Sequence, residues 1–406
     1  MYVLQNNVEI ISGAKKYCIY NLNSGKMYSA DSESIMYLNE ILSGKVEKVV
    51  SPEFISYLLD NDILVVKGKE ARKILEIHDQ IHIDFAWIEI TQNCNLICRH
   101  CYEGSSRADC RPEMSFEDFQ FAIETLKKIG IDRIQLVGGE PLTHTKLCRF
   151  IDYVANKFSF IEIFTNGTLL TDSLLKKIKE AGISLAFSVY SENSRFHDYV
   201  TRTSGSFEKT YTNIKKAMEN GIEVRTASVE MKEISDTQIT SFNVPHRTDL
   251  PRLTGRANLS LYNRDMLRRK LITKETFKQP IVPEEFYRNK IVHNCFGNHL
   301  YIDCNLSVYP CAMERRVQYG NLRTTDKEEL LHNPLRTMTK DKIDGCKDCE
   351  YRYACYDCRC DTNNASIQAK PWYCTYDPLQ GIWEDMDTFI DGLLLSNSNK
   401  SEECES

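Results

Sequence analysis

The chain lacks the features that mark exported, membrane-bound and nucleic-acid-binding proteins. No apolar run approaches the roughly 20 residues that span a bilayer. The first residues do not combine a basic stretch with a following apolar one, which argues against a signal peptide. A formal net charge of −6 provides no basic surface for nucleic acid or an anionic membrane. We therefore expect a cytoplasmic protein with no nucleic-acid and no membrane partner.

Cysteine is abundant by contrast, with 16 among 406 residues. A disulfide framework is not expected in a chain without an export signal, because the cytosol keeps thiols reduced. The cysteines gather in two groups, at 94–110 and 295–374. Such clustering indicates metal or redox chemistry.

Strand and helix patterns alternate over residues 84–290. Repeated βα units of this kind predict an α/β fold with a parallel sheet, here a partial (β/α)6 barrel that stays open. In such folds the chemistry lies on loops that follow the carboxyl ends of the strands. The first cysteine group directly follows the first strand. The predicted strands are 87–91, 133–137, 160–164, 184–189 and 222–228, and the predicted helices are 116–129, 146–157, 173–181 and 210–220.

The first cysteine group has the pattern C-x3-C-x2-C, formed by Cys94, Cys98 and Cys101. Three thiolates so close together can hold three irons of a 4Fe–4S cluster. No fourth cysteine lies at a matching distance, so one iron stays open to bind and reduce a ligand. A zinc site, the alternative, more often has C-x2-C pairs and four closed ligands. The spacing resembles the radical S-adenosylmethionine (SAM) family, which implies that these three catalytic cysteines hold the cluster and that its open iron binds SAM.

Three further segments resemble the SAM pocket of that family. Gly138-Gly139-Glu140 follows the second strand, where glycine lets the backbone approach a ligand and a carboxylate can receive an ammonium group. The resemblance implies that this segment receives the methionyl amino group of SAM. It also implies that Asn166 lies near the ribose and that Ser188 contacts the sugar or the carboxylate. For Asn166 and Ser188 alone, an ordinary turn residue is an equal alternative.

One position departs from the family pattern. Many relatives carry an arginine that meets the SAM carboxylate where this chain has Thr201. Arg195 or Arg202 could replace it. The run Gly255–Ala257 also recurs in the family near the end of the barrel, and His197 is expected to be a structural residue.

The second cysteine group, in residues 291–385, resembles the SPASM domain, an auxiliary module of peptide-modifying radical SAM enzymes that holds two 4Fe–4S clusters. Irregular periodicity in this segment suits a domain organised around metal, with structural zinc as the alternative. The resemblance implies an outer cluster on Cys346, Cys349, Cys355 and Cys374, and an inner cluster on Cys295, Cys311 and Cys358.

The inner set departs from the family in two ways. Leu306 stands where the family usually has glycine. The last ligand usually follows x3, whereas Cys358 follows x2 and Cys360 follows x4. We favour Cys358, with Cys360 as the alternative and Cys304 as a further candidate for a fourth ligand. Without a fourth ligand the inner cluster would keep an open iron, at which a peptide thiolate could bind.

Residues 1–75 are expected to form a separate small domain. Strands at 16–20 and 26–30 form a hairpin, helices follow at 34–42 and from Ser51, and a strand covers 63–66. This order resembles a winged helix, and in peptide-modifying families it resembles the RiPP recognition element, which binds the leader of a ribosomal precursor peptide as an added strand. A structural cap or a DNA-binding winged helix is the alternative, although no dense basic helix is present. At the other end, 390–406 is polar and is predicted to be disordered.

The resemblance thus implies a radical SAM enzyme that abstracts hydrogen from a precursor peptide through a 5′-deoxyadenosyl radical, forming a thioether or a carbon–carbon crosslink. It also implies SAM, three 4Fe–4S clusters and a low-potential electron donor such as a flavodoxin or ferredoxin. Residues 347–359 and 370–378 resemble the grasp-with-spasm type of maturase. The alternatives are a maturase of a whole protein, as in sulfatase maturation, and a non-catalytic iron–sulfur electron carrier.

Overall fold

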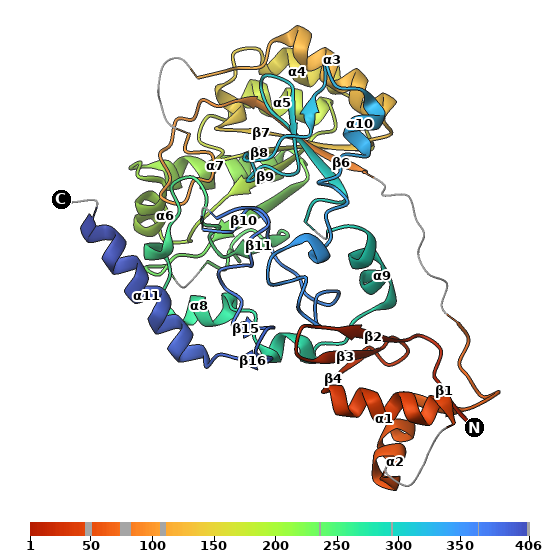
Figure 1. Cartoon of the computed structure of the whole chain (residues 1–406). Coiled ribbons are helices and arrows are strands. Elements are labelled where there is room, and N and C mark those ends of the chain that lie inside the picture. Colours follow the sequence, from red (N-terminus) through yellow and green to blue (C-terminus); the bar gives the residue numbers. More distant parts are fainter. Residues whose placement is uncertain are drawn as a thin grey trace.

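A nine-stranded sheet forms the centre of the molecule. The computed structural model describes residues 1–44, 51–73, 83–105, 111–234, 237–293, 295–363 and 365–403. Its central sheet has the order β11-β10-β9-β8-β7-β6-β12-β13-β14 (Figure 1). Strands β6 to β11 run parallel to one another and β12 runs parallel to β6, whereas β13 pairs antiparallel with both β12 and β14. The bounds are β6 (Phe85–Thr91), β7 (Arg133–Gly138), β8 (Phe160–Thr165), β9 (Ser184–Ser188), β10 (Val224–Val229), β11 (His246–Asp249), β12 (His299–Ile302), β13 (Ser307–Tyr309) and β14 (Gly320–Asn321).

The strand order confirms the predicted α/β fold with its mostly parallel sheet. Six consecutive parallel strands, β6 to β11, correspond to the expected βα series. The two edges of the order are β11 and β14, so the described strands form an open barrel. The carboxyl ends of β6 to β11 therefore meet at one rim, where the predicted chemistry should lie.

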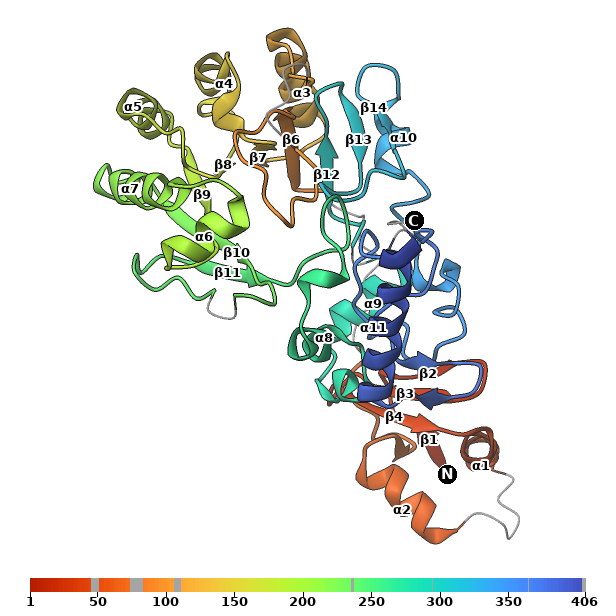
Figure 2. The same ribbon diagram turned by 90° about the vertical axis from the view of Figure 1, so that its left-hand side faces the viewer.

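Helices cover one face of this sheet. Figure 2 shows them in a row outside the strands. Alternate residues of β6, such as Ile88, face these helices and join the main hydrophobic core with Phe119 and Phe150, whose rings stack at 4.1 Å. The intervening residues, Glu89 among them, are left for the opposite, interior face. The bounds of these helices are α3 (Phe116–Lys128), α4 (Leu147–Val154), α5 (Asp172–Glu180) and α7 (Ser206–Glu219), whereas α6 (Ser194–Thr201) lies at the rim beside the cysteine loop.

The N-terminal part lies at the end of the molecule away from α3, α4 and α5 (Figures 1 and 2). The predicted hairpin, both helices and the last strand are present, and β1 and β2 are additional. The part has its own hydrophobic cluster, built around Leu38, Leu58 and Ile63. The bounds are β1 (Tyr2–Leu4), β2 (Val8–Ser12), β3 (Tyr17–Asn21), β4 (Lys26–Ala30), α1 (Ser32–Ser43), α2 (Pro52–Asp60) and β5 (Leu64–Val66), with sheets β2-β3-β4 and β1-β5.

The cysteine-rich part begins by extending the barrel sheet. Strand β12 pairs with β6, so the sequence boundary expected at 290/291 is not a spatial one. The N-terminal part docks on this region, where the Tyr20 hydroxyl donates a 2.9 Å hydrogen bond to the Glu350 carbonyl. The remaining elements are α8 (Arg264–Lys270), α9 (Pro283–Ile291), α10 (Lys327–Leu331), β15 (Tyr376–Asp377), β16 (Ile382–Trp383), and the 3-10 helices η1 (Pro141–Thr143), η2 (Leu259–Leu261), η3 (Lys274–Lys278) and η4 (Lys340–Lys342).

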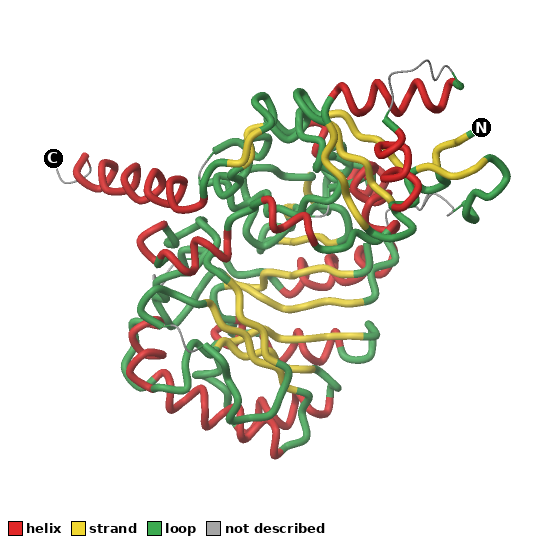
Figure 3. Tube along the Cα trace, turned by 90° about the horizontal axis from the view of Figure 1, so that it is seen from below, coloured by secondary structure: helices red, strands yellow, loops and turns green. Residues whose placement is uncertain are grey.

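The C-terminal segment differs from the disordered tail predicted for 390–406. It contains helix α11 (Met386–Glu403), and only 404–406, with Cys404, lie outside the described residues. The start of the helix is anchored because Ile390 is fully buried and Arg264 pairs with Asp391 at 2.5 Å. Figure 3 shows the far end extending from the molecule. Neither α11 nor any other helix among the described residues is long and apolar enough to cross a membrane.

Candidate active site

The loop that carries Cys94, Cys98 and Cys101 follows β6 at the rim of the barrel, as the sequence predicts. Its backbone is tied to the end of α6, because Arg99 N donates to the Val200 carbonyl at 3.0 Å. Burial raises the pKa of the Cys94 thiol to about 12, and the nearby Glu140 carboxylate adds to this shift. The metal-free thiol is therefore protonated at neutral pH, and binding iron must release its proton.

The two glycines predicted to approach a ligand lie in close contact with the backbone that leads into the cysteine loop. Gly139 N donates to the Thr91 carbonyl at 2.8 Å, and Glu140 N donates to the Asn93 carbonyl at 2.7 Å. A Cβ atom on Gly138 would overlap the Thr91 oxygen, and one on Gly139 would overlap the Asn93 oxygen. Both glycines are thus required where β7 packs against the backbone that leads into Cys94.

The Glu140 carboxyl group lies buried beside this contact, with 1% of its surface exposed. It accepts hydrogen bonds from Leu142 N at 3.0 Å, from the Thr165 hydroxyl at 2.6 Å and from Asn166 N at 2.7 Å. Burial nevertheless raises its pKa to about 7. A ligand ammonium group placed here would favour the carboxylate form, so Glu140 is suited to receive one.

Asn166 and Ser188, the other predicted pocket residues, both lie at the rim. The Asn166 amide donates to Asn95 Oδ1 at 3.0 Å, and its oxygen accepts from Thr168 N at 2.9 Å. Its side chain therefore ties the cysteine loop to the loop after β8. Ser188 ends β9 and hydrogen-bonds Tyr190, whose hydroxyl in turn reaches the Cys98 thiol. Asn166 thus has a structural role in addition to any contact with a ligand.

Arg256 is the arginine that lies beside the cluster thiols. Its Nε donates to the Cys98 carbonyl at 2.9 Å, its Nη1 donates to the Ser105 carbonyl at 2.8 Å, and its backbone N donates to the Cys101 carbonyl at 3.0 Å. Arg195 and Arg202, considered from the sequence, are exposed on and just after α6. The family resemblance includes the segment 255–257, but it predicted no role for the Arg256 side chain.

Unpartnered polar atoms gather around the same loop. Among the described residues, the buried His100 Nδ1, Ser105 Oγ, Thr254 Oγ1 and Arg256 Nη2 have no hydrogen-bond partner. Buried polar groups are normally satisfied. Four such atoms beside three thiols fit a polar ligand held next to an iron–sulfur cluster, as the SAM interpretation requires.

A charged network lies on the interior face beside Cys101. Arg315 Nη2 lies 2.9 Å from both Glu89 Oε2 and Glu103 Oε2, and the Tyr301 hydroxyl donates to Glu89 at 2.5 Å. Burial and the neighbouring Glu89 raise the pKa of Glu103 to about 7. Sequence reasoning missed this network because its members come from β6, the cysteine loop, β12 and the segment after Cys311, which only the fold brings together.

The four cysteines predicted for an outer cluster are brought together. They line one cavity in the cysteine-rich part, together with Lys340 and Arg352. The four residues are Cys346, Cys349, Cys355 and Cys374.

The inner set contains both cysteines that the sequence left as alternatives. Cys358 Sγ and Cys360 Sγ lie 3.1 Å apart, Cys295 contacts Cys358, and Cys311 contacts Cys360. The thiol of the further candidate Cys304 faces the backbone carbonyls of 89 and 112 at 3.4 and 3.6 Å. Four thiols therefore stand where an open iron was considered.

The outer and inner cysteine sets consist of thiols, the ligand type that iron–sulfur clusters use. No three His, Cys, Asp or Glu side chains in the described ranges are arranged to hold one metal ion. A 4Fe–4S cluster instead spreads its four thiolates over four irons. All cysteines of the described part of the chain are free thiols, so each set remains available as ligands.

Leu306, where the sequence resemblance led us to expect glycine, adopts a backbone conformation that glycine favours. It lies in the turn between β12 and β13 with a φ of 66°, in the left-handed region that glycine adopts without strain. Its side chain is 1% exposed and belongs to the main core. This chain therefore keeps the turn and fills the space with an apolar side chain.

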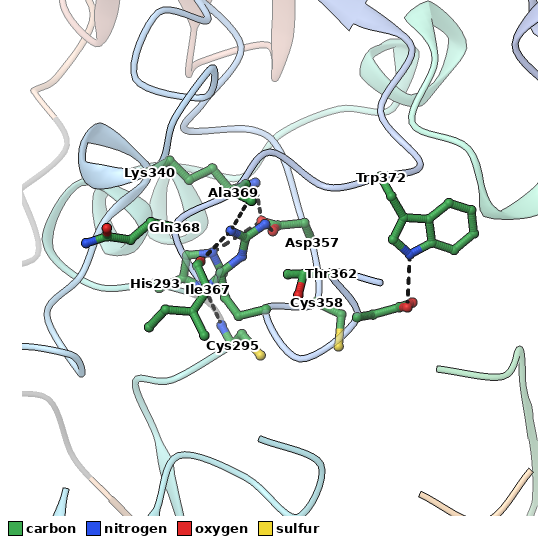
Figure 4. Close-up of polar contacts among 12 residues, drawn as sticks. His293, Cys295, Lys340, Asp357, Cys358, Thr362, Ile367, Gln368, Ala369 and Trp372 are labelled. Atoms are coloured by element: carbon green, nitrogen blue, oxygen red, sulfur yellow. Dashed lines mark hydrogen bonds and ion pairs between the residues drawn. The ribbon is translucent and has the colours of Figure 1, made fainter. Parts of the chain in front are cut away.

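A buried polar network links Cys295 of the inner set to Lys340, which lines the cavity of the outer set (Figure 4). Asp357 lies between Cys355 and Cys358 in the sequence, and its Oδ1 is 2.5 Å from Lys340 Nζ and 3.2 Å from His293 Nε2. His293 Nδ1 accepts from the backbone N of Cys295 at 3.0 Å. Lys340 and His293 stand outside the cysteine motifs, so no sequence signal marks them.

Comparison with known proteins agrees with this geometry. Residues 88–239 match the sequence model of the Radical SAM superfamily. The chain is 23% identical over 348 residues to the AdoMet-dependent heme synthase of Oleidesulfovibrio alaskensis, covering 72% of this chain and 87% of that protein. It is 30% identical over 273 residues to the antilisterial bacteriocin subtilosin biosynthesis protein AlbA of Bacillus subtilis, covering 62% of this chain and 60% of that protein.

Solved structures show the same fold over most of the chain. SuiB of Streptococcus suis bound to precursor peptide SuiA aligns with a TM-score of 0.57 at 14% identity, covering 91% of this chain and 98% of that one. SuiB bound to S-adenosylmethionine aligns with a TM-score of 0.50 at 12% identity, covering 91% and 99%. With the family match, the parallel sheet and the cysteine loop at its rim, residues 88–239 form a radical SAM domain.

Proposed function

We propose that the protein is a radical SAM enzyme that modifies a ribosomally made precursor peptide. The observation that carries the proposal is the gathering of eight thiols into two sets of four, beyond a barrel that already carries a three-cysteine loop. This arrangement resembles the SPASM module of peptide-modifying enzymes. Two related proteins, a bacteriocin biosynthesis protein and SuiB bound to a precursor peptide, support the same substrate class.

The site residues have distinct roles in this proposal. Cys94, Cys98 and Cys101 hold a 4Fe–4S cluster which, when bound, supplies the electron that cleaves SAM to a 5′-deoxyadenosyl radical able to take hydrogen from an unactivated carbon. Glu140 receives the methionyl ammonium group. Arg256 fixes the backbone on which the three thiols stand.

The product is a thioether or a carbon–carbon crosslink in the peptide. A cysteine thiol that closes a thioether on the carbon radical must lose its proton and one electron, and an oxidised cluster held by one of the four-thiol sets would take up that electron. Glu103, on the interior face two positions after Cys101, is suited to accept that proton because its pKa is raised to about 7 by burial and by Glu89. The four-thiol inner set argues against a peptide thiolate that binds an open auxiliary iron.

Substrate capture is assigned to the N-terminal part. The order β2-β3-β4 leaves β2 and β4 as edge strands of a small antiparallel sheet. An extended leader segment can pair with such an edge through main-chain hydrogen bonds. The leader would then hold the core of the peptide near the barrel, and a low-potential flavodoxin or ferredoxin would supply electrons.

The test is anaerobic reconstitution, iron counting and an assay with SAM, dithionite and candidate precursor peptides. We expect roughly twelve irons per chain, as three 4Fe–4S clusters require, with release of 5′-deoxyadenosine and a change in peptide mass. Adding the isolated leader should compete with the full precursor. Bound iron with SAM cleavage but unchanged mass for every cognate precursor would contradict the peptide substrate.

A further inference from the structure

We propose that two buried charges beside the outer four-cysteine set, the Lys340 ammonium and the Glu350 carboxylate, set the reduction potential of the cluster held there in opposite directions. The inference rests on the proposed function only in that the four thiols hold a 4Fe–4S cluster. It assigns a role to two residues outside the cysteine ligands.

Lys340 places a positive charge against the cysteines from η4. The residue is 3% exposed and lines the same cavity as the four thiols. Its Nζ pairs with Asp357 Oδ1 at 2.5 Å, as Figure 4 shows. The same carboxylate also pairs with the buried guanidinium of Arg359. One carboxylate shared by two buried cations leaves positive charge uncompensated, which is costly unless an anionic group is nearby.

Glu350 places a negative charge next to Cys349. The residue is fully buried, and its Oε1 accepts a 2.6 Å hydrogen bond from the Tyr376 hydroxyl, whose residue also lines the cavity. Its Oε2 is buried without a hydrogen-bond partner and lies against Gly13 of the N-terminal part. Water is therefore excluded from this carboxylate as well.

Two other cations on the cavity wall are already engaged. Arg352 donates to Asp341 at 2.7 Å, and Lys370 Nζ donates to the Tyr376 carbonyl at 2.5 Å. The charges of Arg352 and Lys370 are the same in the parent protein and in every variant of Lys340, Lys347 or Glu350. The difference between variants then reports the charge that was changed.

The direction of each effect follows from charge alone. One-electron reduction adds negative charge to the cluster, and cluster potentials depend on net charge, hydrogen bonding and solvent exposure. A buried ammonium stabilises the reduced form and raises the potential, whereas a buried carboxylate lowers it. Both effects persist in salt because buried charges are screened far less than exposed ones.

The experiment is a dithionite titration of the full-length reconstituted protein, followed by electron paramagnetic resonance. Replacing Cys94, Cys98 and Cys101 with alanine removes the signal of the SAM-binding cluster. We expect Lys340→Met to lower the midpoint reduction potential of one auxiliary cluster and Glu350→Gln to raise it. Each shift should change the ratio of oxidised to reduced cluster at a fixed potential about tenfold, which corresponds to about 59 mV for one electron.

Two further variants separate charge from packing. Lys340→Arg keeps the charge and should keep a potential near that of the parent protein. Lys347→Met removes a lysine that directly follows Cys346 but is 51% exposed, and it should leave the potential unchanged. If Lys340→Met fails to bind iron, the direction of the potential shift in Glu350→Gln still tests the proposed charge effect.

The outcomes that overturn the proposal are distinct. Shifts in the same direction for Lys340→Met and Glu350→Gln, unchanged potentials in iron-replete variants, or an equal shift in Lys347→Met would overturn it alone. A parent protein whose outer four thiols bind no iron would overturn it together with the ligand assignment of the proposed function.

Discussion

Arg256 holds Cys98 through a 2.9 Å hydrogen bond from its Nε to the Cys98 carbonyl, across 158 positions of sequence. The same guanidinium group donates to the Ser105 carbonyl, beyond the last cysteine of the loop. One planar side chain thus fixes two points of the backbone that presents the three thiols. A guanidinium group suits this because its donors are held in a rigid fork.

Replacing Arg256 with lysine should weaken the loop. A lysine ammonium group keeps the charge but cannot bond both carbonyls in the same geometry. Changes in groups that orient metal ligands typically cost 10–100-fold in metal affinity or activity, and we expect about that loss in the rate of 5′-deoxyadenosine release. Iron counting after desalting and a SAM-cleavage assay measure both effects.

The matched control is Arg247→Lys, because Arg247 is 74% exposed and pairs with Asp249 at 3.2 Å. It should behave as the unsubstituted protein. Equal iron content and cleavage in Arg256→Lys and Arg247→Lys would show that Arg256 does not support the loop.

Gly139→Ala should damage the same loop from the other side. The added methyl group would overlap the Asn93 carbonyl, so β7 and the cysteine loop must move apart. We expect loss of SAM cleavage, with a lower iron content at the three-cysteine site. Circular dichroism should show that the helices remain, because the affected contact is local.

Gly392→Ala is the matched control for that substitution. Gly392 lies in α11 with nothing within 4 Å of its Cβ position. Alanine should be neutral or stabilise the helix by about 1 kcal/mol. Full SAM cleavage in Gly139→Ala would contradict the assigned packing role of the glycine.

The barrel and its cysteine loop could be predicted because their signals are local. Strand β6 ends three residues before Cys94, and the C-x3-C-x2-C spacing is read within eight positions. Helix α11 was not predicted because the segment is polar on average, whereas its start is held by the buried Ile390 and by ion pairs to α8. Average composition does not report which single residue will be buried.

The site residues that were missed depend on contacts between distant segments. Arg256 and Glu350 stand inside segments that the sequence marks, at 255–257 and 347–359, but the spacing assigns neither side chain a partner, and Lys340 stands outside the cysteine motifs. Cys360 was marked as an alternative to Cys358, but spacing alone cannot tell one ligand from two adjacent ones. The fold supports both as candidates, because Cys358 contacts Cys295 and Cys360 contacts Cys311.

SAM affinity should depend on pH through Glu140. Burial raises the pKa of this carboxyl group to about 7, so it gains a proton as the pH falls through 7. The methionyl ammonium group needs the carboxylate form, and we expect SAM binding to weaken about tenfold per pH unit below 7. Equilibrium dialysis of the reconstituted protein between pH 6 and pH 8 measures this.

The stability of the folded chain should depend on pH in the opposite direction to SAM affinity. The folded chain keeps a proton on Glu140 that the unfolded chain releases near 4.5, the ordinary pKa of a glutamate side chain, so this group lowers stability as the pH rises from about 4.5 to 7. Glu140→Gln should bind SAM weakly and remove the slope in affinity. A slope that survives in Glu140→Gln would assign the titration to another group.

Leu306 should show that backbone strain and packing act in opposite directions. Leu306→Gly relieves the left-handed backbone but removes a buried side chain, which typically costs 2–5 kcal/mol when leucine is truncated. Leu306→Ala loses nearly the same packing and keeps the strain, roughly 1–2 kcal/mol. We therefore expect stability in the order Leu, then Gly, then Ala, measured as urea midpoints by tryptophan fluorescence. An alanine variant more stable than the glycine variant would show that the turn carries no strain.

Cysteine substitutions should identify the inner ligands. Cys360→Ala removes one of four gathered thiols and should lower the iron content from roughly twelve toward eight per chain, since a 4Fe–4S cluster normally needs four thiolates. Cys304→Ala should leave the iron content unchanged, because its thiol faces the backbone carbonyls of 89 and 112. Both thiols are buried, so the pair controls for the loss of a buried sulfur. Equal iron content in the two variants would leave Cys358 as the only inner ligand from residues 358–360. The inner cluster would then again have three thiol ligands and an open iron.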